Sequence, residues 1–211
     1  APAIAAAQAK FGWIGAAITL IVALAGLAFG YTKIKAGFPA RTRIERIVIE
    51  TQEPGVRIID KTGPLANPAD RDHCLQYMVA VPLIHGRLTA ADYEDGVAVD
   101  PRIDRLRACM EVRENSQFTA DYYDPCKRYI GNALQVFFRD GSTSERVQVD
   151  FPIGHRRRRA EGMPVLVRKF ETSVATHYDA AQARAIHGLF RDAGRLDALP
   201  VDEFVGALAK R

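Results

Sequence analysis

A histidine and the four arginines that follow it are the residues whose types and spacing are suited to chemistry. The segment FPIGHRRRRAEGMP, residues 151–164, places His155 directly before Arg156 to Arg159. Planar guanidinium groups make paired, charge-assisted hydrogen bonds with carboxylates, and histidine exchanges protons near neutral pH. The run therefore indicates one of three roles: a nucleic-acid patch, a solvated hinge, or a cationic pocket for a substrate with several carboxylates.

The arginines cannot all point the same way. In an extended stretch, side chains alternate between two faces, so we expect Arg156 and Arg158 to face opposite to Arg157 and Arg159. Arg156, Arg157 and Arg158 are the candidate substrate-binding residues, with one or two of them turned toward a cleft between domains; a purely structural hinge is the alternative. His155 is the candidate acid–base catalyst, and its alternative role is a histidine bonded to a backbone carbonyl.

A second group of polar residues lies in the segment RDHCLQYMVAVPLIHG, residues 71–86, which predicts a helix that ends at a glycine. Tyr77 follows His73 by four residues, so both would lie on one helical face. We name them as candidate substrate-binding residues, with a core tyrosine as the alternative for Tyr77. Asp72 and His73 are adjacent, and adjacent side chains on a helix diverge, so we expect them to have separate roles in capping or a salt bridge.

Composition and charge exclude several classes of protein. The 211 residues provide one substantial domain or a domain with an appendage. The formal net charge of +4 is concentrated around residues 33–46 and 156–159, whereas a nucleic-acid-binding protein spreads its cations over a face and interleaves aromatic residues. Cys74, Cys109 and Cys126 form no CxxC or CxxH pair. We therefore expect no nucleic-acid partner, no metal site, and reduced thiols in the cytoplasm.

The elements expected along the chain change character at the arginines. Alternating apolar residues predict strands over 43–52 and 56–60, and NALQVFFRD and ERVQVDFPI around GSTS predict a β-hairpin. Pro101 begins a further helix, and apolar residues with a period near 3.6 predict helices throughout the segment after the arginines. The expected fold class is α+β, with three parts: 1–37, 38–153 and 154–211.

The apolar segment 11–31 stands apart from the rest, because it contains no charged residue. A helix of this length spans ~30 Å, the thickness of a bilayer core. Trp13 and Tyr31 lie near its ends, and basic residues follow it, which would place the remainder of the chain in the cytoplasm. A transmembrane helix and a buried helix rich in alanine and glycine both remain open as interpretations.

Several unusual strings resemble the 2-methylcitrate dehydratase family, which belongs to a superfamily with cis-aconitate decarboxylase and the MmgE proteins. They are GPLANPADRDHCLQYMVAVPLIHGRLTAADYED, DPRIDRLRACM, FPIGHRRRRAEGMPVLVRKF and LPVDEFV. The resemblance covers about residues 38–211. It implies a helical domain built from both chain ends and an α+β lid between them, of which this chain would supply the lid (about 42–153) and the returning helices (about 160–211).

The resemblance also implies a chemistry and its residues. It implies a hydro-lyase that acts on a tricarboxylate without an iron–sulfur cluster or other cofactor, and a homodimer. Lys35, three residues before Phe38 and Pro39, matches the family's cleft lysine; its alternative role is a membrane-flanking anchor. The histidine-containing helix that follows this motif in the family is missing, and residues 1–31 do not resemble the family. We therefore expect little activity from the chain alone.

Two other functions remain as alternatives. One is a non-enzymatic membrane-anchored subunit or assembly protein, in which a degenerate lyase segment follows a transmembrane helix. The other is a carboxylate-binding module that retains the arginines without catalysis.

Overall fold

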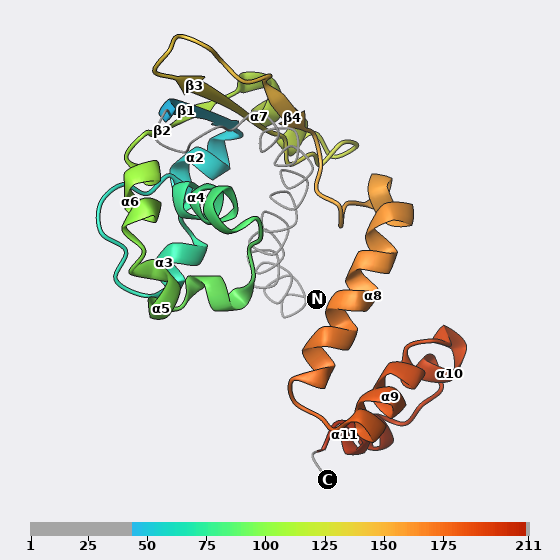
Figure 1. Cartoon of the computed structure of the whole chain (residues 1–211). Helices are drawn as coiled ribbons and strands as arrows, with labels where there is room; N and C mark the ends of the chain where they lie inside the picture. The colour runs from blue at the N-terminus through green and yellow to red at the C-terminus, as the bar shows by residue number, and fades with distance from the viewer. Residues whose placement is uncertain (1–43, 210–211) are drawn as a thin grey trace. The chain divides into compact units, whose positions relative to one another are not determined.

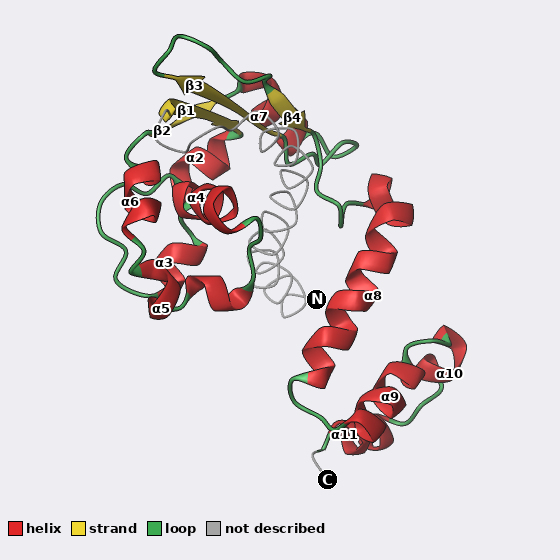
Figure 2. Ribbon diagram, viewed as in Figure 1, coloured by secondary structure: helices red, strands yellow, loops and turns green. Residues whose placement is uncertain are grey.

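The chain folds into two compact units. The computed structural model describes residues 44–209, so Lys35 and the apolar segment 11–31 lie outside the described residues. The first unit ends at Arg158 and the second begins at Arg159. Strands occur in the first unit, whereas the described part of the second unit is built from helices (Figures 1 and 2). The expected mixture of α and β structure is confirmed.

A four-stranded sheet organises the first unit, with the strand order β2-β1-β3-β4. The strands are β1 (Ile44–Thr51), β2 (Met110–Glu114), β3 (Asn132–Phe138) and β4 (Val147–Val149). β1 pairs in parallel with β2 and antiparallel with β3, which in turn pairs antiparallel with β4. The predicted strand over 43–52 and the predicted hairpin are therefore confirmed.

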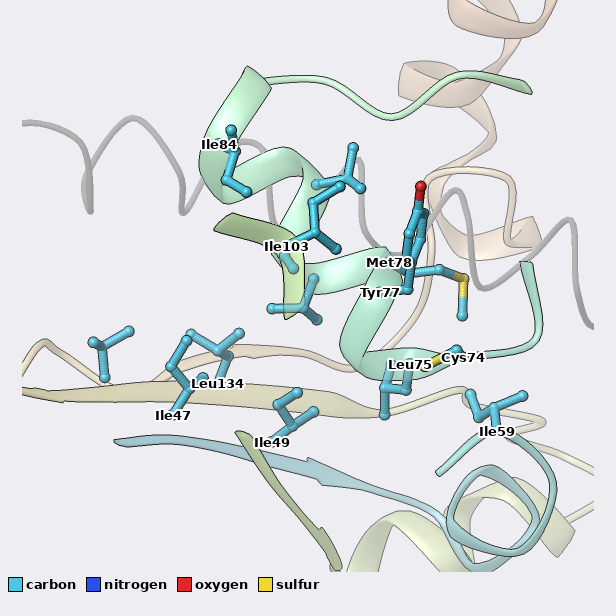
Figure 3. Packing of buried hydrophobic residues seen from close by; sticks show 14 of the residues in the cluster. Ile47, Ile49, Ile59, Cys74, Leu75, Tyr77, Met78, Ile84, Ile103 and Leu134 are labelled. Atoms are coloured by element: carbon cyan, nitrogen blue, oxygen red, sulfur yellow. The ribbon is translucent and has the colours of Figure 1, made fainter. Parts of the chain in front are cut away.

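The core lies between this sheet and helix α4 (Leu75–His85). Ile47 is opposite Val136 and Ile49 is opposite Leu134, so alternate residues of two strands present one apolar face. Ile47, Ile49 and Leu134 lie between the sheet and α4 (Figure 3), and Val136 belongs to the same buried cluster. α4 is buried on nearly all sides, as expected of a helix that is apolar all round.

Short helices connect the strands. They are α2 (Glu53–Ile59), α3 (Pro68–Asp72), the 3₁₀ helix η1 (Ala90–Tyr93), α5 (Asp95–Ala98), α6 (Pro101–Arg107) and α7 (Ser116–Tyr123). The side chains of Asn67, Asp100 and Asn115 accept hydrogen bonds from the first turns of α3, α6 and α7. These caps satisfy amide groups that have no partner within the helix.

Several local expectations were wrong. Residues 56–60 were expected to form a strand, but they lie largely in α2, because Pro54 occupies its first turn and the amides of Gly55 and Val56 donate to Gln52 O. The single helix expected over 71–86 is two helices, α3 and α4, separated at His73. β2 and α7 were not predicted.

A buried polar network fixes the segment that follows α4. Asp92 accepts hydrogen bonds from the amide and the hydroxyl of Thr89, each over 2.7 Å, and so closes a capping box at η1. Arg71 is buried; its Nη1 donates to the carbonyl of Tyr93 over 2.7 Å, and its Nη2 lies 2.7 Å from Asp95 Oδ1. The charges are satisfied locally, which is the condition for burying them.

The second unit contains α8 (Arg159–Ala175), α9 (Ala180–Leu189), α10 (Ala193–Asp197) and α11 (Val201–Leu208). Phe190 joins three of these helices, with ring centroids 5.0 Å from Phe170 and 6.2 Å from Phe204. The hydroxyl of Tyr178 donates to Leu208 O over 2.8 Å. The predicted helices after the arginines are confirmed.

An ion pair at the end of β1 ties the sheet together. Arg146, just before β4, donates from Nε and Nη2 to the two carboxylate oxygens of Glu50 over 2.9 and 2.7 Å, and Asn115 Nδ2 donates over 2.7 Å. The hydrogen bond from Arg146 is the main reason that the pKa of Glu50 falls from 4.5 to about 2, although burial acts against it. Glu50 therefore contributes stability that is fully present above pH 4.5 and is lost as the pH falls toward 2.

We predict that Glu50→Gln lowers the free energy of unfolding by about 1 kcal/mol at neutral pH, since the pair is partly exposed and screened by solvent. The difference from the unsubstituted chain should shrink as the pH falls from 4.5 toward 2. Urea unfolding at several pH values measures both. Glu45→Gln, on the exposed side of the same strand, is the control and should have little effect. An equal effect of both substitutions would contradict the prediction.

Candidate functional site

The candidate residues fall into two clusters in the first unit. The arginine turn (residues 155–158) follows β4, and the α3–α4 corner (residues 71–74) joins α3 to α4. The core positions both clusters. The arginine turn follows β4, which is paired with β3, and the corner leads into α4, which packs on β1 and β3.

The arginine turn is a 3₁₀ helix, and not the extended stretch that we expected. Arg156–Arg158 form the 3₁₀ helix η2, in which Arg158 N donates to His155 O over 2.8 Å. His155 N donates to Pro152 O over 2.9 Å and begins the turn. With three residues per turn, successive side chains point in three directions. The predicted alternation between two faces is therefore wrong.

Each arginine of the turn contacts the first unit in its own way. Arg156 Nη2 donates to the carbonyl of Cys126 over 2.6 Å, and the guanidinium of Arg157 lies 5.4 Å from the ring centroid of Tyr129. Arg158 is half-buried and donates to Phe151 O over 3.4 Å. Arg156 and Arg157 are exposed, and within residues 44–209 neither forms an ion pair with a carboxylate. Two guanidinium groups are thus held at the surface with capacity to bind an anion.

Aromatic rings support the turn. The ring of His155 stacks on Phe151 at 5.0 Å between centroids, and Tyr129 meets both rings edge-on at 5.2 and 6.1 Å. Arg128, next to Tyr129, is exposed and has a φ of 51°, in the left-handed region that bulky residues seldom adopt. Arg128 thus lies in the same loop as Cys126 and Tyr129, which contact Arg156 and Arg157.

Main-chain groups hold His155 in place. Its Nδ1 accepts a hydrogen bond from Arg157 N over 3.2 Å, so the neutral ring carries its proton on Nε2. Burial lowers the pKa of His155 below 6.5; a hydrogen bond to the main chain at Arg128 opposes this effect, and the charge of Arg156 adds to it. This geometry is that of a histidine bonded to the backbone, the alternative role. A catalytic role for His155 stays a prediction.

Asp72 and His73 are bonded to each other at the α3–α4 corner, which contradicts the expectation that their side chains diverge. His73 Nδ1 donates to Asp72 Oδ1. The expectation assumed one continuous helix, but α3 ends at Asp72, and His73 has non-helical angles of φ −109° and ψ 24°. The main chain turns between them, so the two side chains converge.

Tyr77 lies in the core. Its hydroxyl donates to Asp92 O over 2.7 Å, and its ring stacks on Tyr93 at 5.9 Å between centroids. Burial raises the pKa of Tyr77. The expected helical face shared with His73 is wrong, because His73 precedes α4. Substrate contact by Tyr77 stays a prediction.

The sequence did not reveal the contacts of three contributors to these clusters. The carbonyl of Cys126 carries no signal, since main-chain acceptors are the same in every residue. Tyr129 gave a weak signal, as an aromatic residue next to two cations. The hydrogen bond between Asp72 and His73 depends on the end of α3 at Asp72, which the sequence pattern does not show. No cluster of metal-ligating side chains occurs in the part of the chain that the structure describes.

Acidification should loosen the arginine turn. Because the folded pKa of His155 lies below 6.5, the unfolded chain binds the proton more readily, and stability falls as the pH drops below 6.5. We predict that His155→Gln reduces this loss, measured as the change in urea midpoint between about pH 8 and about pH 5. His177→Gln, at an exposed position of the second unit, is the control. An unchanged pH dependence in His155→Gln would refute the prediction.

Comparison with known proteins identifies relatives of the region that holds both clusters. The family model of the MmgE/PrpD C-terminal domain matches residues 33–193. A 2-methylcitrate dehydratase of Cupriavidus necator is 55% identical over 166 residues, which are 79% of this chain and 34% of that protein. The 2-methylcitrate dehydratase of Salmonella typhimurium is 53% identical over 175 residues, 83% of this chain and 36% of the relative.

A more distant relative shows the same pattern. The mitochondrial 2-methylcitrate dehydratase of Yarrowia lipolytica is 49% identical over 168 residues, 80% of this chain and 32% of its own length. The chain thus spans about a third of the length of the relatives it matches. The match to the family model covers most of the chain, including β1, the α3–α4 corner and the arginine turn. The chain belongs to the MmgE/PrpD C-terminal domain family.

Proposed function

We propose that this chain is the C-terminal part of a hydro-lyase that dehydrates 2-methylcitrate to 2-methyl-cis-aconitate in propionate catabolism. The observation that carries the proposal is the pair of exposed guanidinium groups, Arg156 and Arg157, within the region that is 51–55% identical to bacterial 2-methylcitrate dehydratases. Relatives of this chain bear that name; the activity is proposed here for the protein to which this chain contributes.

The chemistry of the substrate fits the charge at the arginine turn. Methylcitrate carries three carboxylates and a tertiary hydroxyl group. Dehydration removes a carbon-bound proton β to this hydroxyl, forms the double bond from that electron pair, and expels the hydroxyl as water. Cations near the carboxylates offset the charge that develops as the proton leaves. Arg156 and Arg157 supply such cations, while Arg158, bonded to Phe151 O, also holds the turn together.

The second unit supports the proposal that a helical domain is completed by chain beyond the matched region. α8 exposes Met163, Leu166 and Val167, which are spaced to lie on one helical face, and α11 exposes Val201 and Val205. An unpaired apolar stripe of this kind normally packs against another element. We propose that in the full-length relatives the helices preceding the matched third cover this stripe, and that the first unit is the lid over them.

The alternative function receives no support from the comparisons. Neither the family match nor the relatives point to a membrane-anchored subunit or an assembly protein. Among residues 44–209, no helix has the length and apolar character needed to cross a bilayer. We retain the cytoplasm as the proposed location and a homodimer as the proposed assembly.

The proposal predicts that catalysis needs the remainder of the enzyme. We expect the chain alone to convert 2-methylcitrate at least ~100-fold more slowly than a chimera, because acid–base groups outside this chain contribute factors of this size. In the chimera, residues 44–211 replace the matching C-terminal part of the Escherichia coli 2-methylcitrate dehydratase. The absorbance of the product's double bond follows turnover. An inactive, folded chimera would count against the proposed function, and rapid turnover by the chain alone would refute the need for other segments.

The arginine turn should set substrate affinity. In the chimera, we predict that Arg156→Ala combined with Arg157→Ala raises KM for 2-methylcitrate about 10-fold or more, since two charge-assisted contacts are lost. Arg105→Ala, which removes an equally exposed cation from α6, should leave KM within about twofold. An unchanged KM in the double variant would exclude the turn as a carboxylate-binding site.

A further inference from the structure

The α3–α4 corner holds a histidine whose surroundings differ from those of the chain's other histidines. We propose that Asp72 and His73 form a proton-transfer dyad, in which His73 Nε2 exchanges a proton with the bound hydroxy-acid substrate and Asp72 is the positioning residue. The inference rests on the proposed function and deepens it, since it assigns an acid–base group to this third of the enzyme. Neither the family match nor the names of the relatives assign such a role to these residues.

The corner is a fixed piece of structure. Asn67 caps α3 through its side chain, which accepts from Asp70 N over 2.9 Å, and Cys74 N donates to Arg71 O over 3.3 Å at its end. The buried guanidinium of Arg71 anchors the corner, because it donates to Tyr93 O and lies 2.7 Å from Asp95 Oδ1. Asp72 and His73 therefore stand on a backbone that is held on both sides.

The hydrogen bond between the two residues sets the tautomer of His73. A carboxylate oxygen accepts, so the proton lies on Nδ1, and the neutral ring presents the lone pair of Nε2. The side chains of His73 and Asp72 are 42% and 39% exposed, so solvent and small molecules reach both. Among residues 44–209, Nε2 of His73 has no hydrogen-bond partner.

The other histidines with bonded rings are arranged differently. His155 uses Nδ1 to accept from Arg157 N and bonds further main-chain groups. His85 and His187 direct Nε2 toward carboxylates, at 3.9 Å from Asp100 and 3.4 Å from Glu171. In His73, by contrast, Nδ1 is hydrogen-bonded to the carboxylate of Asp72. Nε2 therefore remains available to a ligand, as a general base requires.

A buried phenol near the dyad is a second, independent observation. Tyr93 is 6% exposed, and its hydroxyl is buried without a hydrogen-bond partner among the described residues. The charge of Asp72 is the next cause, after burial, that raises the pKa of Tyr93, so the phenol lies within electrostatic reach of the dyad. Buried polar atoms without partners are uncommon, and a catalytic role is one of the physical reasons for them. The corner thus combines an oriented imidazole and a carboxylate, and its Arg71 is hydrogen-bonded to the main chain of Tyr93, whose phenol has no hydrogen-bond partner among the described residues.

The proton transfer is balanced within the proposed dehydration. Nε2 takes the carbon-bound proton of the substrate, and the electron pair of that bond forms the double bond as the carbon–oxygen bond breaks. Asp72 stabilises the imidazolium through the hydrogen bond on Nδ1. The departing hydroxyl leaves as water with the proton held on Nε2, which regenerates the neutral histidine.

Two measurements test the dyad, and the first needs no turnover. In the ¹⁵N-labelled full chain, long-range ¹H–¹⁵N correlation spectra report the tautomer of each histidine. We expect His73 as the Nδ1–H tautomer and a shift toward the Nε2–H tautomer, the form preferred by free histidine, in Asp72→Ala. Asp104→Ala, which removes an exposed carboxylate from α6, should change nothing at His73. A predominantly Nε2–H tautomer in the unsubstituted chain overturns the proposal.

The second measurement uses the active chimera described above. His73→Gln should lower kcat at least ~100-fold. Asp72→Asn should lower kcat while it leaves KM within about threefold, a split that a merely structural substitution would not give. If the chimera is active and His73→Gln stays within about threefold of it, the dyad is wrong and the proposed function stands. If the chimera is inactive, the proposed function fails, and the tautomer spectra decide the dyad geometry alone.

Discussion

The packing of α4 on β1 and β3 is the interaction on which the rest of the first unit depends. β1 is hydrogen-bonded on both sides, and its Ile47 and Ile49 form with Val136 and Leu134 the apolar face beneath the helix. α4 has no polar face to leave in solvent, so it also needs cover on its other sides, which Tyr93 of η1 and Ile103 of α6 help to provide. A helix enclosed in this way cannot rotate or slide without exposing apolar side chains to water.

This constraint explains why two chemically distinct clusters are well defined. The α3–α4 corner immediately precedes the buried helix, so the position of His73 follows from that of Leu75 and the residues after it. The arginine turn is fixed differently, through the hairpin and the loop before β3, where Cys126 O and Tyr129 hold Arg156 and Arg157. Elsewhere in the first unit many cations are neutralised in place, as Arg146 is by Glu50 and Arg71 by Asp95. The exposed charge of Arg156 and Arg157, which form no ion pair among the described residues, is therefore a local property and not a consequence of the net charge.

The elements that could be predicted from the sequence are those whose pattern is set by burial on one face. β1, the hairpin and the late helices repeat their apolar residues with the period of the element, and the structure confirms them. The failures come where a single contact decides the outcome. Pro54 and the carbonyl of Gln52 turn an apolar run into α2 instead of a strand. His73 and Cys74, which lie outside both helices, separate α3 from α4, and the turn at His73 brings Asp72 alongside it. The 3₁₀ geometry of the arginines likewise depends on Pro152 O and His155 O, which no pattern of side chains reveals.

The two units differ in how much apolar surface they bury. The first unit buries a continuous core, whereas the second keeps only a few side chains buried, among them Val174 and Ile186, and exposes Met163, Val201 and Val205. A helical unit that buries so little has a small driving force for folding by itself, because the hydrophobic contribution grows with the apolar area removed from water. The first unit can therefore hold groups such as the Asp72–His73 pair on a rigid core, whereas the described part of the second unit has little buried apolar surface to stabilise it by itself.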